Sequence, residues 1–317
     1  MPCPGALSPK LQAADLKGKV AIISGSTRGI GKACAIALAK QGCNIVVAAK
    51  STQEQDNLPG TIYSVAEEIQ KLGVEALPVM VDMRKLDTIK ECVQLTVQKF
   101  GRIDIVINNA SALWWQRMEN TPMNKYDLIT EINVRGSFAL TSLSLPHMAK
   151  NKFGRVISMS PPIETSFKRF AGFTAYNISK MGMTMVAMGA AAEYAGKGIT
   201  GHSLWPATVI ESYASINFQL GDKKDWRKAE ILSDCVLGLV SAPDSVTGLQ
   251  LLDDEYLKEH HGFSQEDLAV YRCDPNHEPP RSLADQIEDG VIRRGDVRKL
   301  DKDLQSSKSS GIQSSKL

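Results

Sequence analysis

The chain has 317 residues, of which 43% are hydrophobic and 23% are charged, and its formal net charge is +2. This balance excludes collagen-like, disulfide-scaffold and wholly disordered proteins, and it gives no reason to expect a nucleic-acid partner or an anionic-membrane partner. The six cysteines are scattered, without a C-x-x-C pair or histidines at ligand spacing. We therefore expect reduced thiols and no metal site.

The sequence predicts neither a membrane-spanning segment nor a secretory signal. The longest small-apolar stretch, 181–192, is well short of the roughly 20 residues that a transmembrane helix needs. Residues 1–19 contain several prolines and no continuous apolar run, which argues against a secretory signal. We expect no membrane span.

From Lys19 onward, short apolar runs alternate with longer amphipathic segments, which is the rhythm of βαβ units. The expected strands are 20–24, 44–49, 75–81, 103–107, 155–159 and 199–204, with a weaker one near 250–252. The expected helices are 30–40, 62–72, 87–100, 122–150 and 172–196. Nearly continuous apolar strands suit a parallel sheet covered on both faces, so we expect one doubly wound, Rossmann-type α/β fold.

The domain boundaries follow from changes in composition. No Pro/Gly/Ser-rich linker interrupts the rhythm over 17–255, which we assign to one cofactor-binding and catalytic domain. Residues 256–300 are charged and punctuated by prolines, and we assign them to a C-terminal extension. Residues 301–317 are rich in serine and poor in apolar residues, so we expect a flexible tail.

A glycine-rich loop follows the first expected strand. This strand runs into the segment G-S-T-R-G-I-G, and a helical pattern opens directly behind it. Glycines allow a tight turn and let backbone N–H groups approach a pyrophosphate, whose charge is favoured at a helix N-terminus. The alternative is a tight turn without a ligand. We expect cofactor binding by Gly25, Ser26, Thr27, Arg28, Gly29, Ile30 and Gly31.

Further motifs occur in chain order behind this loop. They are Asn108-Asn109-Ala110 after the fourth strand, Asn133, the segment Ser158-Met159-Ser160 at the fifth strand, and Tyr176-Asn177-Ile178-Ser179-Lys180. Together with the G-x-x-x-G-x-G spacing, they resemble the short-chain dehydrogenase/reductase family over about residues 17–260. The resemblance implies a nicotinamide-dependent oxidoreductase, in which Asn109 contacts the cofactor.

The choice of cofactor depends on the end of the second strand. An NAD enzyme needs Asp or Glu there to accept from the ribose 2′-hydroxyl, but this chain has Ala49 followed by Lys50. Arg28 and Lys50 can flank a 2′-phosphate instead, so we expect NADP(H); the alternative is that both are ordinary surface charges. The resemblance places Asp82 against the adenine ring, and capping of the next helix is the alternative for this residue.

The catalytic assignment starts from two residues that are four apart and therefore share one helix face, Tyr176 and Lys180. A phenol near pKa 10 is a poor proton donor or acceptor at neutral pH, and a nearby ammonium favours the phenolate. We expect Tyr176 to be the general acid/base and Lys180 to tune it. By resemblance, Lys180 also holds the nicotinamide ribose, Ser160 polarises the substrate carbonyl, and Asn133 holds a water in a proton relay.

The serine position has two candidates. The gap between Ser160 and Tyr176 is longer than the usual family spacing, and Pro161 lies nearer the usual serine position. Ser158 is therefore an alternative to Ser160. The substrate pocket is expected from the Trp114 region, from 161–173 and from 207–230.

Shorter motifs resemble one branch of the family, the hydroxysteroid dehydrogenase-like type 2 branch. They are Ala-Ala-Lys at 48–50, Leu-Pro-Gly-Thr-Ile-Tyr at 58–63, Asn-Asn-Ala-Ser-Ala at 108–112, Ser-Pro-Pro at 160–162 and Leu-Trp-Pro at 204–206. The branch implies a peroxisomal or mitochondrial NADP-type oxidoreductase of lipid metabolism with a lipid-like substrate. It often carries a C-terminal sterol-carrier-like domain, and we expect none within these 317 residues.

The last expectations concern address and assembly. Ser315-Lys316-Leu317 is the tripeptide read by the peroxisomal import receptor, so we expect a peroxisomal protein. Helices 122–150 and 172–196 resemble those through which the family forms homo-oligomers. The alternatives to a carbonyl/alcohol oxidoreductase are a peroxisomal enoyl-CoA reductase of the same fold and a non-catalytic NADP-binding regulatory protein.

Overall fold

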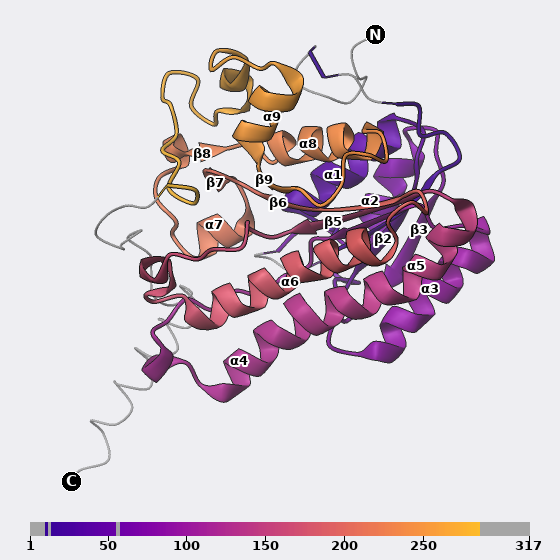
Figure 1. Cartoon of the computed structure of the whole chain (residues 1–317), viewed down its shortest axis with the longest axis horizontal. Coiled ribbons are helices and arrows are strands. Elements are labelled where there is room, and N and C mark those ends of the chain that lie inside the picture. The colour runs from indigo at the N-terminus through magenta and orange to yellow at the C-terminus, as the bar shows by residue number, and fades with distance from the viewer. Residues whose placement is uncertain (1–9, 12–13, 55–57, 286–317) are drawn as a thin grey trace.

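The computed structural model describes residues 10–11, 14–54 and 58–285 (Figure 1). Seven parallel strands form one sheet in the order β3-β2-β1-β4-β5-β6-β9. This order confirms the doubly wound α/β fold expected from the βαβ rhythm. The strands are β1 (Val20–Ser24), β2 (Asn44–Ala49), β3 (Ala76–Met80), β4 (Ile105–Asn108), β5 (Gly154–Met159), β6 (Ile199–Trp205) and β9 (Gln250–Leu252).

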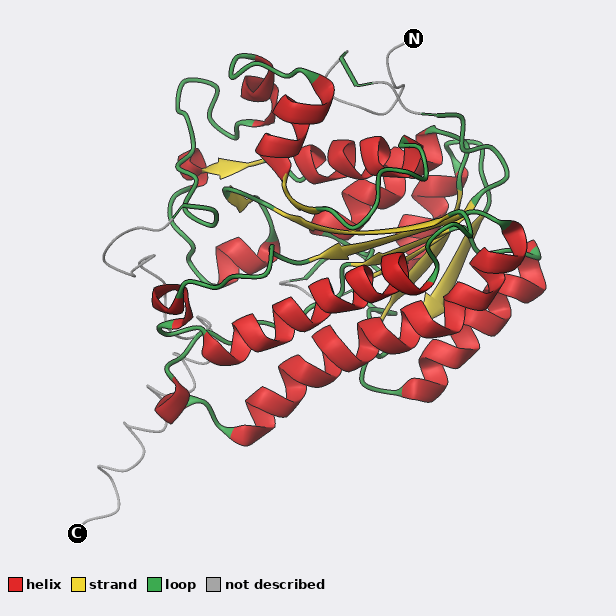
Figure 2. Cartoon of the chain, viewed as in Figure 1, coloured by secondary structure: helices red, strands yellow, loops and turns green. Residues whose placement is uncertain are grey.

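Alternation along the strands builds two separate cores. Ile22 packs into the core on one face of the sheet and Ile23 into the core on the other, because successive side chains of a strand point to opposite faces. One core is covered by α1 (Gly29–Lys40), α2 (Ile62–Gln70) and α8 (Glu230–Ser241). The other is covered by α3 (Leu86–Phe100), α5 (Ser137–Asn151) and α6 (Thr174–Glu193), and Figures 1 and 2 show this layering.

The long helix expected over 122–150 is divided into three parts. Helix α4 (Met123–Ile129) continues into a π-helical turn, Thr130–Gly136, and then into α5. A π-helical turn holds more residues than an α-helical turn and is frequent near functional sites. Asn133 lies inside this turn and is fully buried.

Helix α8 has no counterpart among the expected elements. All residues from Ile231 to Val240 are buried, so the helix is enclosed on every side and lacks the polar face that reveals a surface helix in sequence. It packs against α1 and against α9 (Asp253–His261).

The described part of the C-terminal extension belongs to the same packed body. Helix α9 runs across position 255, where the sequence placed the end of the domain. Leu268 and Tyr271 are fully buried in the core beneath α8, and the Tyr271 hydroxyl donates to Asp234 Oδ2 at 2.5 Å. The tail 301–317, with Ser315, Lys316 and Leu317, lies outside the described residues.

Smaller elements surround the carboxyl end of the sheet. They are β7 (Val209–Ile210), β8 (Trp226–Arg227), α7 (Tyr213–Asn217) and the 3-10 turns Met118–Asn120, Phe167–Phe170, Lys223–Asp225 and Asp267–Tyr271. Within the described ranges, no helix is both long enough and apolar enough to span a bilayer.

Candidate active site

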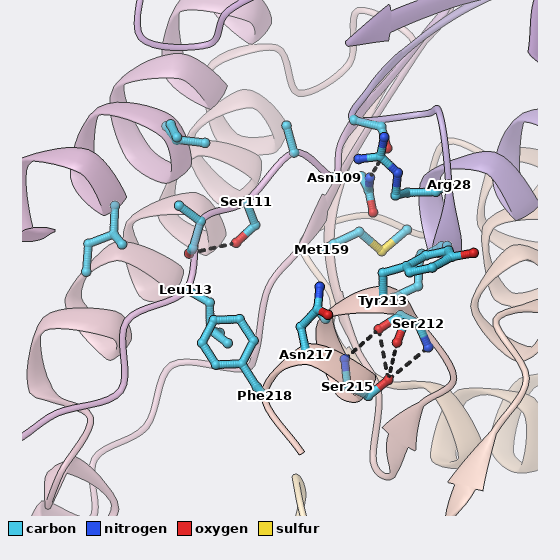
Figure 3. Close-up of a pocket in the computed structure, with 18 of the residues that line it drawn as sticks. Arg28, Asn109, Ser111, Leu113, Met159, Ser212, Tyr213, Ser215, Asn217 and Phe218 are labelled. Carbon is cyan, nitrogen blue, oxygen red and sulfur yellow. Dashed lines mark hydrogen bonds between the residues drawn. The ribbon is translucent and has the colours of Figure 1, made fainter. Parts of the chain in front are cut away.

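A cavity of about 670 Å³ lies at the carboxyl edge of the sheet. Segments that follow β1, β2, β3, β4 and β6 line it, together with Met159 at the end of β5 and residues of α4, α6 and α7. The strand order reverses between β1 and β4, and doubly wound sheets bind ligands in the crevice at such a reversal. In the view of Figure 3, Arg28 and Tyr213 lie on one side, Leu113 and Phe218 on the other, and Met159 between them.

The glycine-rich loop is built for close approach of its backbone to a ligand and to Asn109. Gly25 has a φ of +69°, which L side chains rarely adopt. A Cβ at Gly31 would lie 2.5 Å from Asn109 Nδ2 and 2.5 Å from the Gly25 carbonyl oxygen. Asn109 Nδ2 donates to the carbonyl oxygens of Ser24, at 2.9 Å, and Gly25, at 3.1 Å. Asn109 therefore braces the loop from the end of β4.

The same loop fits the pyrophosphate of a dinucleotide. It leads directly into α1, whose first turn carries no acidic residue and whose N-cap residue, Arg28, makes no side-chain capping bond. The N-terminal N–H groups of α1 thus form an anion site. The buried Ser26 Oγ has no hydrogen-bond partner within the described part of the chain, and Thr27 lines the cavity.

The two basic residues expected at a 2′-phosphate differ in their surroundings. Both line the cavity. Arg28 donates to the carbonyl oxygens of Leu58, Pro59 and Gly60 and to Ser51 Oγ, at distances from 2.9 to 3.2 Å, and it thereby fixes the segment after β2. Lys50 is exposed at the cavity rim. Lys50 is therefore the more available cation for a ligand.

Asp82 also reaches the cavity, and its carboxylate is held by Arg84. Hydrogen bonds from the Arg84 guanidinium lower the pKa of Asp82 to about 2. Helix α3 begins at Leu86 with Lys85 as its N-cap residue and without a side-chain capping bond. The alternative role of Asp82 as a helix cap is therefore wrong, whereas its contact with adenine stays a prediction.

Helix α6 presents Tyr176 and Lys180 to the cavity from one face. Lys180 Nζ donates to the Met159 carbonyl oxygen at 2.9 Å and lies 5.9 Å from the centroid of the Tyr176 ring. The side chain of Lys180 is almost fully buried, and this burial lowers the pKa of its ammonium to about 7. Lys180 can therefore bind or release a proton near neutral pH.

Neither serine at the end of β5 lines the cavity. Ser160 Oγ accepts from Thr184 Oγ1 at 2.8 Å and donates to the Ser158 carbonyl oxygen at 3.4 Å. Ser158 Oγ accepts from Asn108 Nδ2 at 3.5 Å, and both serines are fully buried. The residue between them, Met159, lines the cavity instead. This placement agrees with the side-chain alternation of a strand, which puts residues 158 and 160 on one face.

The Asn133 side chain is committed to the protein. Its Oδ1 accepts from the Ala112 backbone N–H at 2.8 Å, and its Nδ2 donates to the Ala112 carbonyl oxygen and to Ser179 Oγ. Asn133 therefore fixes the segment that begins the opposite wall of the cavity, where Ser111 to Trp115 line it. The proton-relay role expected for Asn133 stays a prediction.

An aromatic group forms the wall beyond Tyr176. The Trp115 ring meets the rings of Tyr176, Phe173 and Phe218 at centroid distances of 5.7, 6.1 and 6.0 Å. Trp114 and several residues of 207–230 also line the cavity, as expected from the sequence. The expected segment 161–173 supplies no lining residue within the described chain, and Leu283 lines the cavity although no sequence signal marked it.

No group of three or more His, Cys, Asp or Glu side chains is placed to hold a metal ion, as far as residues 10–11, 14–54 and 58–285 show.

The family model described as short chain dehydrogenase matches residues 19–215. The chain belongs to this family. The matched segment begins one residue before β1 and ends in α7, so it contains the glycine-rich loop, Asn133, Tyr176 and Lys180. The family binds nicotinamide cofactors and consists of oxidoreductases, in agreement with the loop geometry.

Relatives support the same assignment. Hydroxysteroid dehydrogenase-like protein 2 of Danio rerio is 40% identical over 280 residues, which are 87% of this chain and 66% of that protein. The protein of the same name from Mus musculus is 39% identical, and the match covers 87% of this chain and 56% of that protein. The chain thus spans less than two thirds of the length of these relatives. A short chain dehydrogenase from Mycobacterium thermoresistibile has a TM-score of 0.77 and 38% identity, covering 84% of this chain and 94% of that one.

Proposed function

We propose that the protein is an NADP(H)-dependent oxidoreductase that interconverts a carbonyl group and a secondary alcohol on a lipid-derived substrate such as a fatty-acyl or steroid-like molecule. One observation carries the proposal: a single cavity joins the glycine-rich loop, the basic residue Lys50, the Tyr176–Lys180 pair and an aromatic wall. The alternatives, an enoyl-CoA reductase and a non-catalytic regulatory protein, share the first two of these features.

The charges around the cofactor half of the cavity favour NADP(H). The loop from Gly25 to Gly31 and the N-terminus of α1 would hold the pyrophosphate, and Lys50 with the Ser51 hydroxyl would face the ribose end. No carboxylate follows β2 at Ala49 and Lys50, so a 2′-hydroxyl lacks its usual acceptor whereas a 2′-phosphate gains a cation. Arg28 would act indirectly, because it orders Ser51 and the segment 58–60.

In the catalytic half, the Tyr176–Lys180 pair would move the proton that accompanies hydride transfer. Bound nicotinamide supplies the hydride for reduction or takes it up in oxidation. The Tyr176 phenol would donate a proton to the carbonyl oxygen in reduction and accept it from the alcohol in oxidation. Lys180, whose pKa is lowered to about 7, would support the phenol in either direction by its charge and by exchanging protons with it. Ser160 and Ser158 stay candidates for a supporting donor.

The side chains that line the cavity beyond Tyr176 indicate the substrate class. Beyond Tyr176 the cavity is bordered by Trp115, Phe218, Leu220 and Ile210, so the substrate body that extends from the reacting carbon would be apolar. A family member of 26% identity and TM-score 0.64, 7α-hydroxysteroid dehydrogenase, was solved with NADH and 7-oxo glycochenodeoxycholic acid, a lipid-like oxo compound.

The proposal is tested by turnover and binding on the same preparation. NADPH and NADH oxidation is followed with a panel of steroid ketones, 2-alkanones and 2-enoyl-CoA thioesters, and the Kd of both cofactors is measured by fluorescence. Ketone reduction with preference for NADPH is the expected result. Reduction of enoyl-CoA alone would replace it by the enoyl-CoA reductase alternative. Tight NADPH binding without turnover of any compound would leave the regulatory protein.

We further propose a peroxisomal homo-oligomer. The address rests on Ser315-Lys316-Leu317, and it is tested by fusing residues 306–317 to a fluorescent protein and removing Leu317 as the control.

The assembly is supported by exposed apolar side chains on helices that lie together, Met123 on α4, Phe138 on α5 and Met185 on α6. Phe138→Asp should lower the mass measured by light scattering, and an unchanged mass would contradict this interface.

A further inference from the structure

The last described segment of the chain lies against the cavity. We call residues 279–285 the strap. One of its residues, Leu283, lines the cavity, and the other lining residues that the structure describes lie between Gly25 and Leu220. The strap also lies beyond residue 215, where the match to the family model ends. The strap therefore adds to the cavity a lining residue from outside the segment that matches the family model.

The strap is fixed to the loop after β6 by backbone hydrogen bonds. The N–H groups of Leu283 and Ala284 donate to the Ala207 carbonyl oxygen at 3.0 and 3.2 Å. On its other side, the Ala207 N–H donates to Asp253 Oδ1 at 2.8 Å. The two residues before Ala207, Trp205 and Pro206, line the cavity. The strap is thus joined directly to the loop that carries part of the active-site wall.

Two arginines, Arg281 within the strap and Arg169 outside it, fix the strap to its neighbours. Arg281 pairs with Asp254 Oδ2 at 3.1 Å and with Glu255 Oε1 at 2.6 Å, both on α9, and the Asp254 carboxylate is buried. Arg169, in the 3-10 turn before α6, donates from Nη2 to the Ala284 carbonyl oxygen at 2.6 Å. The strap consequently connects α9 with the 3-10 turn before α6, two elements that are far apart in sequence.

Leu283 belongs to a small apolar cluster that is separate from both main cores. Val209, Leu220 and Trp226 form its buried centre, and Trp115, Phe218, Cys273 and Leu283 pack against it. Trp115 connects this cluster to Tyr176, since their ring centroids are 5.7 Å apart. A molecule whose reacting carbon lies at Tyr176 and whose body follows Trp115 therefore extends toward Leu283.

We propose that Leu283 is a specificity-determining residue that limits how far an apolar substrate body can extend from Tyr176, and that Arg281 is a positioning residue that holds Leu283 there through Asp254 and Glu255. The inference rests on the proposed function, because it assigns the substrate end of the same cavity. A leucine at position 283 selects substrates with a straight-chain or narrow apolar body of limited length over longer ones.

The first experiment changes the size of the wall in the full chain. Wild type, Leu283→Ala and Leu283→Trp are compared in kcat/KM for NADPH-dependent reduction of the series from 2-hexanone to 2-tetradecanone. We expect Leu283→Ala to raise the ratio of long-chain to short-chain kcat/KM on the order of tenfold, and Leu283→Trp to lower it similarly. Leu72→Ala, at an exposed leucine after α2, is the matched control and should leave the ratio unchanged.

The second experiment loosens the strap without altering the wall residue. Arg281→Gln removes both ion pairs to α9. We expect KM for the longer ketones to rise on the order of tenfold while kcat and the Kd of NADPH change by less than about twofold. Lys99→Gln, which removes the pair of Lys99 with Glu75 at the amino end of β3, is the control and should change none of these values.

The outcomes separate this inference from the proposed function. If wild type reduces the ketones and the chain-length ratio is the same in wild type and in both Leu283 variants, the specificity role is overturned while the oxidoreductase stands. If wild type reduces none of them, the same series is titrated by tryptophan fluorescence: a shift of the preferred length in the Leu283 variants supports the wall role without catalysis. Failure of every ketone to bind overturns both proposals for this substrate class.

Discussion

The two halves of the cavity are built in different ways. The cofactor half consists of backbone and short side chains at the ends of β1, β2 and β4, and Asn109 and Arg28 brace it through carbonyl oxygens. The substrate half consists of large side chains that come from segments far apart in sequence, such as Trp115, Phe218 and Leu283.

This difference separates what is general from what is particular to this protein. A loop that binds through backbone N–H groups tolerates little change, because a Cβ at Gly31 would overlap Asn109 and Gly25. A wall of side chains can be changed one residue at a time, with the sheet left intact. We therefore expect substitutions in the two halves to separate cofactor binding from substrate choice.

The largest effect is expected at the boundary between the halves. Tyr176→Phe removes the phenolic hydroxyl and keeps the ring that packs against Trp115. It should lower kcat/KM for ketone reduction on the order of 10³-fold and leave the Kd of NADPH within about twofold. Steady-state kinetics and cofactor fluorescence measure both. Retention of most of the activity would show that Tyr176 is not the general acid.

Lys180 provides a test through pH. Its pKa is lowered to about 7 by burial, so the ammonium loses its proton as pH rises above 7. Reduction needs a protonated phenol supported by that charge, and its kcat/KM should therefore fall above about pH 7. Lys180→Arg keeps the charge at all these pH values, and the fall should move to higher pH although the rate at its maximum drops on the order of 10²-fold. An identical pH profile in the variant would contradict the assignment.

Lys50 tests the cofactor half alone. Lys50→Glu replaces the exposed rim cation by a carboxylate, the group that an NAD enzyme uses at the end of its second strand. The Kd of NADPH should rise about 10- to 100-fold, the Kd of NADH should fall, and the preferred ketone length should stay the same. Lys40→Glu, on the last turn of α1, is the control. An unchanged ratio of the two Kd values would break the 2′-phosphate argument.

The smallest effect is expected in the free energy of unfolding, at Asp253. Its carboxylate accepts from the Ala207 N–H in the loop after β6. Burial raises the pKa of Asp253 to about 7. Between about pH 4 and pH 7 the folded state keeps this proton while the unfolded state has lost it, so the free energy of unfolding falls as pH rises through this window. Asp253→Asn keeps the Oδ1 acceptor for the Ala207 N–H and does not titrate.

Urea unfolding at pH 5 and pH 8 measures this difference. Relative to wild type, Asp253→Asn should gain on the order of 2 kcal/mol of stability between pH 5 and pH 8. Asp87→Asn, at an exposed carboxylate in the first turn of α3, should gain nothing over the same interval. Parallel curves for wild type and Asp253→Asn would place the proton elsewhere.

The sequence signals of the cofactor half are local, and the residues that carry them line the cavity in the folded chain. Glycines at fixed spacing, a strand before them and a helix behind them are read within a few residues, and the βαβ rhythm predicts a doubly wound sheet, which the structure confirms. Helix α8 was missed for the opposite reason: buried on all sides, it has no polar face and so no helical period.

The substrate half depends on contacts that no local pattern encodes. Leu283 reaches the cavity only because its N–H group and that of Ala284 bind the Ala207 carbonyl oxygen, more than 70 residues earlier in the chain. The interpretation of Arg28 as a phosphate ligand likewise could not include the carbonyl oxygens of 58–60, which approach it only in the folded chain. Motif order indicated that Ser160 lies at the site, but in the folded chain Ser160 is fully buried, accepts from Thr184 Oγ1 and does not line the cavity.

The π-helical turn Thr130–Gly136 bears on how such a protein can diverge. Successive residues of an α-helix are about 100° apart around its axis, so an insertion or deletion of one residue in this turn rotates α4 relative to α5 by about that angle. Lys125, Leu128 and Ile129 of α4 line the cavity, and α5 is packed into the core. Insertion or deletion of a single codon in the gene could thus turn a new set of α4 side chains toward the substrate while every strand keeps its register.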